Sequence, residues 1–196
     1  MNDLVKIVVP DAGPINTLAA ANLLHLLLAP PNSKLVVVES VFDEIIVRSS
    51  ELKRFMDENK VRIEKVETFT CRAIKERLSR GEVVERGRGD LAVADFLLYH
   101  VDDVVGNSPA LLISEDRTLV NRLSKLESYT EQTHFITTAA YLRKLELEEI
   151  IDSFDDIWKL LVNKNASPDP AIHRAPNTLE REIPSENESR IFPPKL

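Results

Sequence analysis

The chain has 196 residues, of which 43% are hydrophobic and 29% are charged, a balance typical of a globular domain and not of a disordered or fibrous chain. Its single cysteine, Cys71, excludes an internal disulfide framework and a multi-cysteine zinc site. The longest apolar run, residues 15–29, contains polar side chains and is shorter than the ~20 residues of a membrane span. A net charge of −7 argues against a surface that binds nucleic acid over its whole area. We therefore expect a cytoplasmic protein without a membrane segment.

Short β-branched runs alternate with longer helical patterns along the chain. The predicted strands are Leu4–Val9, Leu35–Val38, Ala110–Ile113 and Phe135–Thr137. Residues 62–69 alternate apolar and charged side chains, a pattern that fits either an edge strand or a linker. The predicted helices cover residues 14–29, 50–59, 72–79, 90–99, 117–126 and 148–161, and a further helix is predicted to begin at Ser40.

A strand-then-helix order with continuous apolar strands is typical of a parallel sheet covered by helices on both faces. We therefore predict an α/β fold, a three-layer α/β/α domain with a central, mainly parallel sheet over residues 1–162. Residues 163–196 hold six of the eleven prolines, and we predict that they form an extended Pro-rich tail. Isoleucines and arginines in this tail suggest a further hypothesis, that it docks on its own or a neighbouring subunit, but the composition favours a plainly disordered tail.

Four acidic residues stand where strands give way to helices. Asp11 follows the first predicted strand, and Glu44 lies in the helix after the second. Asp90 opens an apolar helix, and Asp116 follows the strand Ala110–Ile113. In a parallel α/β sheet the carboxyl ends of the strands share one edge, so all four acids could meet there. Each acid taken alone would more often be a helix cap or a partner of the helix dipole.

Four carboxylates gathered without cations would repel one another and protonate. Hard divalent ions with oxygen ligands remove that conflict, which favours Mg²⁺ or Mn²⁺, and the absence of a His/Cys ligand set argues against zinc. Such ions can activate a water and stabilise the leaving oxyanion of a phosphodiester. They also reconcile an acidic protein with a polyanionic substrate.

At these residues the sequence resembles the PIN-domain nucleases, a family that includes the VapC-type toxins, over about residues 6–161. The motifs that carry the resemblance are Ile7-Val8-Val9-Pro10-Asp11, Val41-Phe42-Asp43-Glu44, Gly89-Asp90-Leu91-Ala92-Val93-Ala94 and Leu111-Leu112-Ile113-Ser114-Glu115-Asp116-Arg117. Each motif is loose alone, and their order and spacing together are more specific.

The resemblance implies a metal-dependent endoribonuclease, the toxin of a toxin–antitoxin pair, that uses Mg²⁺ or Mn²⁺. Carried over by position, the metal ligands and catalytic residues are Asp11, Glu44, Asp90 and Asp116. It also implies an RNA substrate, an antitoxin protein as partner and a possible homodimer. Ser114 would orient Asp116 or a metal-bound water through its hydroxyl.

Three departures from the family pattern leave alternatives open. Ala12 and Gly13 follow the first acid, where a hydroxyl residue is common, so a catalytically weak PIN-like module that binds RNA or protein is the alternative function. Asp43 beside Glu44, and Glu115 beside Asp116, are rival ligands. We prefer Asp116 for the Ser-x-Asp spacing, and Glu44 for its longer side chain.

Two further sets of residues have supporting roles in this interpretation. Asp95 lies ~140° around the helix from Asp90, so we expect it to support the site or the fold rather than bind metal. The basic stretch 72–88 leads into Asp90, and Arg86 and Arg88 are candidates to hold RNA phosphates; a solvated helix face is the alternative.

Overall fold

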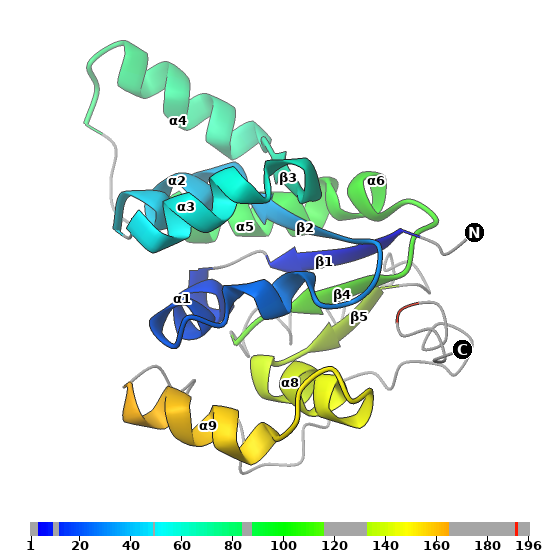
Figure 1. The fold of residues 1–196 in the computed structure, drawn as a ribbon. Coiled ribbons are helices and arrows are strands. Elements are labelled where there is room, and N and C mark those ends of the chain that lie inside the picture. The colour runs from blue at the N-terminus through cyan, green and yellow to red at the C-terminus, as the bar shows by residue number, and fades with distance from the viewer. Residues whose placement is uncertain are drawn as a thin grey trace.

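The computed structural model describes residues 4–9, 12–48, 50–83, 88–115, 133–164 and 191. Five strands form one sheet in the order β3-β2-β1-β4-β5, and every neighbouring pair is parallel (Figure 1). The strands are β1 (Val5–Val9), β2 (Ser33–Val38), β3 (Ile63–Val66), β4 (Ala110–Ile113) and β5 (Thr133–Ile136). Helices flank this sheet, so the predicted three-layer α/β/α fold is confirmed.

In the described residues, helices follow β1, β2, β3 and β5, as expected of a parallel sheet. They are α1 (Ala12–Ala20), α2 (Glu39–Arg48), α3 (Ser50–Glu58), α4 (Phe69–Ser79), α5 (Arg88–Tyr99), α6 (Val101–Val105), α8 (Thr138–Leu147) and α9 (Phe154–Asn163), with short 3-10 helices η1 (Leu24–Leu28) and η2 (Lys60–Arg62). Figure 1 shows α4 extending beyond the sheet, and its packing partner is α5. None of the helices in the described ranges is long and apolar enough to span a bilayer.

The order of the strands creates a switch point between β1 and β4. From β1 the chain proceeds through β2 to β3 on one side, and it then returns to place β4 and β5 on the other side. Val8 of β1 pairs with Leu112 of β4, so these two strands end next to each other. In open α/β sheets this is where ligands bind, at the carboxyl ends of the strands.

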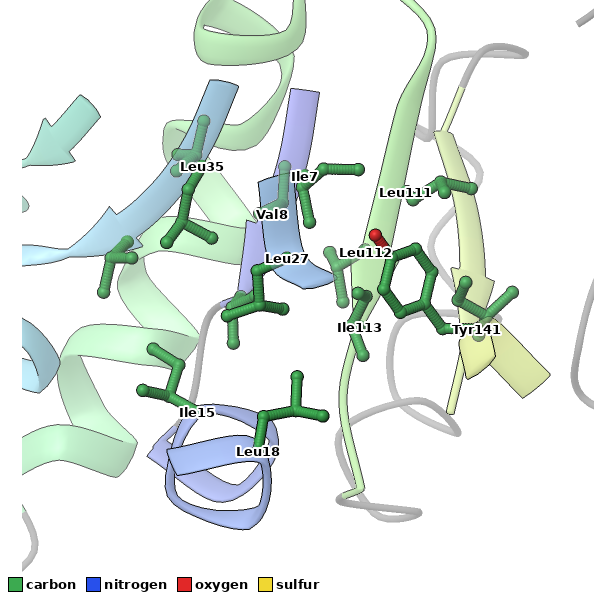
Figure 2. Close-up of a cluster of buried hydrophobic side chains, with 14 of the residues drawn as sticks. Ile7, Val8, Ile15, Leu18, Leu27, Leu35, Leu111, Leu112, Ile113 and Tyr141 are labelled. Atoms are coloured by element: carbon green, nitrogen blue, oxygen red, sulfur yellow. The ribbon is translucent and has the colours of Figure 1, made fainter. Parts of the chain in front are cut away.

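The core is built from the faces of the central strands and the helices packed on them. Figure 2 shows Ile15 and Leu18 of α1 pointing towards Leu27 of η1, and all three side chains are fully buried. Tyr141 of α8 is also fully buried, and its hydroxyl donates a hydrogen bond to the carbonyl oxygen of Leu26 at 2.6 Å. This bond ties the last described strand–helix unit to the segment between β1 and β2.

Two predicted helices in the described ranges differ from the observed ones, and the helix predicted over 117–126 lies outside the described residues. The apolar run 14–29 is divided because Asn22 adopts a positive φ of 61°, which ends α1 and separates it from η1. The predicted helix over 148–161 is wrong in its first turns, because Glu149 has a positive φ of 54° and α9 begins only at Phe154. The undecided segment 62–69 contains the edge strand β3, which pairs in parallel with β2.

Three residues of the predicted tail are described: Asn163 ends α9, Lys164 follows it, and Ile191 is buried. Ile191 has no exposed surface and belongs to the hydrophobic core. A buried isoleucine side chain stabilises the fold because its apolar surface is removed from water. Ile191 is therefore in contact with the core.

Candidate functional site

Glu44 lies on the exposed face of α2, the helix that begins directly after β2. Val41 and Ile45 of the same helix are buried, which fixes the orientation of α2 and leaves Glu44 exposed. Oε2 of Glu44 lies 3.6 Å from the position that a Cβ atom on Gly89 would take. The Glu44 carboxylate therefore reaches the first turn of α5.

Asp90 belongs to that same first turn of α5, directly after Gly89. The direction of its side chain lies outside the described part of the structure. The packing of α2 against α5 nevertheless brings together two stretches of chain whose acids are 46 residues apart in sequence. Of the four predicted ligands, these two are brought into one neighbourhood by described residues.

The other two predicted ligands, Asp11 and Asp116, lie outside the described residues. The strands that precede them, β1 and β4, are the hydrogen-bonded neighbours at the switch point. Within the described ranges, no three His, Cys, Asp or Glu side chains form a group that could hold a metal ion.

Ser114 is the first residue after β4, and it is buried. Its backbone N–H donates to the carbonyl oxygen of Ile136 at 3.2 Å, which extends the β4–β5 ladder by one residue. This bond holds Ser114, the first residue of the predicted Ser-x-Asp motif, at the carboxyl edge of the sheet.

Glu115 makes a contact that the sequence did not indicate. Its Oε1 accepts a hydrogen bond from the backbone N–H of Thr138, the first residue of α8, at 2.9 Å. The hydroxyl of Thr137 accepts from Ala140 at 3.2 Å in the same helix end. The Glu115 carboxylate is thus engaged in the start of a helix, whereas Asp43, the other rival ligand, is exposed on α2.

Asp95 joins α5 to α4. It is buried, its Oδ2 accepts from the backbone N–H of Thr70 at 2.5 Å, and its Oδ1 lies 3.7 Å from Nε2 of His100. The ring of Phe69 lies against the His100 imidazole, with 4.8 Å between ring centroids. Asp95 therefore has a structural role: from α5, the helix that also carries Asp90 in its first turn, it binds the start of α4.

The basic side chains of α4 and the residues after it are engaged with nearby acids. The ion pairs are Arg72–Glu67, Lys75–Glu39, Lys75–Glu67, Arg77–Glu82 and Arg80–Glu82. Hydrogen bonds from Lys75 hold the pKa of the Glu67 carboxyl below its usual value, and Glu39 and Glu67 together raise the pKa of Lys75. Arg86 and the side chain of Arg88, the predicted RNA contacts, lie outside the described residues.

The matched region of the chain runs from β1 to the residues after α4. Residues 7–84 match a PIN domain. The matching family model is DUF3368, described as a PIN domain, and it covers β1 from Ile7 onward, then β2, β3 and α4, together with Asp11 and Glu44. The match ends before Asp90 and Asp116. No curated protein matches the chain.

The observed sheet and its flanking helices are those of a PIN-like α/β/α fold. The candidate ligands are all carboxylates, a donor set that fits Mg²⁺ or Mn²⁺ and does not fit zinc.

Proposed function

We propose that this protein is a metal-dependent endoribonuclease that hydrolyses RNA phosphodiester bonds, and that it acts as the toxin of a toxin–antitoxin pair. The observation that supports the proposal best is the reach of the Glu44 carboxylate to Gly89, beside Asp90. Two acids in one neighbourhood, Glu44 on α2 and Asp90 on α5, would repel each other, and a divalent ion bound between them would remove that repulsion. The match to a PIN domain agrees with a nuclease of this type.

In this proposal Asp11, Glu44, Asp90 and Asp116 hold Mg²⁺ or Mn²⁺. When bound, the ion supplies a polarised water and stabilises charge on the leaving oxygen. The chain supplies the acids: Glu44 extends from the exposed face of α2, and the proposed role of the buried Ser114 is to orient Asp116. In this proposal the acids attract a cation, and the bound cation contacts the RNA phosphate. An acidic protein can therefore act on a polyanionic substrate.

A single-turnover cleavage assay with a fluorescent RNA tests the proposal. The wild-type protein should cleave in Mn²⁺ and stop when EDTA is added, and Asp11→Asn should reduce the rate by about 100-fold or more, the order expected when a metal ligand is lost. Asp43→Asn is the matched control, because it neutralises the exposed carboxylate beside Glu44. Cleavage by Asp11→Asn at the wild-type rate would refute the proposed site.

The same assay tests the alternative of a PIN-like module that binds RNA or protein without cutting. That alternative rests on Ala12 and Gly13, which stand where a hydroxyl residue is common in the family. RNA bound in a gel-shift experiment but left intact in Mn²⁺ would favour it over the nuclease.

The proposed partners are RNA as substrate and an antitoxin protein as inhibitor, with a homodimer as the proposed assembly. Co-expression with the product of a neighbouring small reading frame tests the antitoxin. The expected result is a co-purifying complex in which RNA cleavage is suppressed, and an active enzyme with no co-purifying protein would argue against it.

A further inference from the structure

Two helices of this protein begin with the same arrangement of hydrogen bonds. At α8 the Thr137 hydroxyl accepts from Ala140, and Glu115 Oε1 accepts from Thr138 at 2.9 Å. At α9 the Ser153 hydroxyl accepts from Asp156 at 3.2 Å, and Glu146 Oε1 accepts from the first residue, Phe154, at 2.8 Å. In both cases a glutamate satisfies the first N–H of the helix, which has no partner within the helix itself.

The two glutamates differ in what they connect. Glu146 is eight residues before its partner and joins α8 to the helix that follows. Glu115 is 23 residues before its partner and joins the exit of β4 to the start of α8. Since Ser114 is also bonded to Ile136 through its backbone, residues 114 and 115 are both fixed to the β5–α8 unit.

This attachment lies immediately before Asp116, the proposed metal ligand. We propose that Glu115 is a positioning residue of the metal site and not a ligand: by holding residues 114 and 115 against β5 and the start of α8, it fixes the backbone that leads into Asp116. The inference rests on the proposed function and deepens it, because it assigns separate roles to the two adjacent acids. A residue that orients a ligand typically changes metal affinity by about 10–100-fold when it is removed.

Two substitutions separate position from charge. Glu115→Gln keeps the length of the side chain and an acceptor oxygen for the Thr138 N–H, and it loses the charge. Glu115→Asp keeps the charge and is one methylene too short to reach the same N–H. A positioning role therefore predicts that Gln is tolerated and Asp is not. A ligand role predicts that both substitutions weaken metal binding, and a purely electrostatic role predicts that Asp is tolerated and Gln is not.

The test measures Mn²⁺ binding to the full-length protein by isothermal titration calorimetry, together with the thermal midpoint of unfolding. Glu115→Asp should weaken Mn²⁺ binding by about tenfold, and Glu115→Gln should stay within about threefold of wild type. The controls are Glu146→Asp and Glu146→Gln, which alter the equivalent bond at α9. They should shift the thermal midpoint as the Glu115 pair does and leave Mn²⁺ affinity unchanged.

The outcomes distinguish the two levels of the proposal. If the wild-type protein binds no Mn²⁺, the proposed function fails, and the role of Glu115 fails with it. If the wild type binds Mn²⁺ but Glu115→Asp binds as tightly as Glu115→Gln or more tightly, Glu115 does not position the site. Equal losses of Mn²⁺ affinity in the Glu115 and Glu146 variants would also overturn the inference, because they would reflect loss of stability alone.

Discussion

Glu44 and Gly89 lie in contact across the junction of α2 and α5, with Oε2 of Glu44 3.6 Å from the place of a Cβ atom on Gly89. That distance is an ordinary van der Waals contact, so Gly89→Ala should fold and keep its Mn²⁺ affinity within about threefold. Gly89→Leu is also compatible with a helix, but its longer side chain would occupy the space of the Glu44 carboxylate. We expect it to weaken Mn²⁺ binding by about tenfold, measured by calorimetry. Equal affinities in the two variants would show that Glu44 takes no part in the site.

The hydrogen bond from Tyr141 to Leu26 gives a prediction about stability. Burial raises the pKa of the Tyr141 phenol, because the charged form would be desolvated. Tyr141→Phe removes the donor and leaves the Leu26 carbonyl oxygen without this partner, so the free energy of unfolding should fall by about 1–2 kcal/mol in urea denaturation. Tyr99→Phe, at a side chain that is 65% exposed, should change it by less than about 0.5 kcal/mol. Similar losses in both variants would contradict a special role for the buried bond.

Ile191 gives a second prediction about stability, and it concerns the C-terminal segment. Ile191→Ala removes a fully buried side chain from the core and should cost about 2–4 kcal/mol of unfolding free energy. The matched control is Ile150→Ala, at an isoleucine that is 37% exposed, and it should cost about 1 kcal/mol or less. If Ile191→Ala is no more destabilising than the control, the Ile191 side chain does not pack on the core in solution.

Lys75 gives a prediction that depends on pH. It donates to Glu39 at 2.6 Å and to Glu67 at 2.8 Å, and so links α4 to the residues that follow β2 and β3. Lys75→Met should raise the pKa of Glu67 towards its ordinary value of 4.5, as followed by NMR titration of its carboxyl group. Lys159→Met, which removes an ion pair on α9, should leave the pKa of Glu67 unchanged.

The lowered pKa of Glu67 and the raised pKa of Lys75 make the contribution of this ion pair to stability depend on pH. The lowered pKa of Glu67 stabilises the fold above the ordinary carboxyl pKa and ceases to do so as the pH falls through the lowered value. The raised pKa of Lys75 stabilises the fold below the ordinary lysine pKa and ceases to do so as the pH rises through the raised value. The link should therefore hold from roughly pH 5 to pH 10 and weaken with added salt, because the pair is exposed. Loosening of α4 at neutral pH, seen as fast amide exchange, would contradict it.

The central strands could be predicted from the sequence because they are continuous apolar runs. Ala110–Ile113 was predicted with the bounds that β4 has, since a fully buried parallel strand carries no polar interruption. The edge strand β3 could not be decided, because it is only half-covered and its identity depends on pairing with β2, a partner distant in sequence. The hydrophobic pattern of a strand therefore predicts whether the strand is buried, but it does not predict which distant strand it pairs with.

The helix boundaries near α9 show the same limit. The apolar period continues through residues 148–161, so periodicity alone gave one helix. Glu149 in the left-handed region and the Ser153 cap set the true start at Phe154. Ser153 followed by two aspartates was a local signal that would have placed it correctly.

For the candidate site, the sequence indicated which acids follow strands and in what order. It did not indicate that Glu115 binds the start of α8, because Thr138 is 23 residues away and the bond exists only in the folded chain. The roles of Asp11, Glu44, Asp90 and Asp116 as ligands remain predictions.

The most direct test of the account is Mn²⁺ binding by single substitutions of the four proposed ligands, Asp11→Asn, Glu44→Gln, Asp90→Asn and Asp116→Asn, compared with Asp43→Asn. We predict that each of the four weakens binding by about tenfold or more and that Asp43→Asn binds as the wild type does. Wild-type affinity in all four variants, or no Mn²⁺ binding by the unmodified protein, would contradict the account.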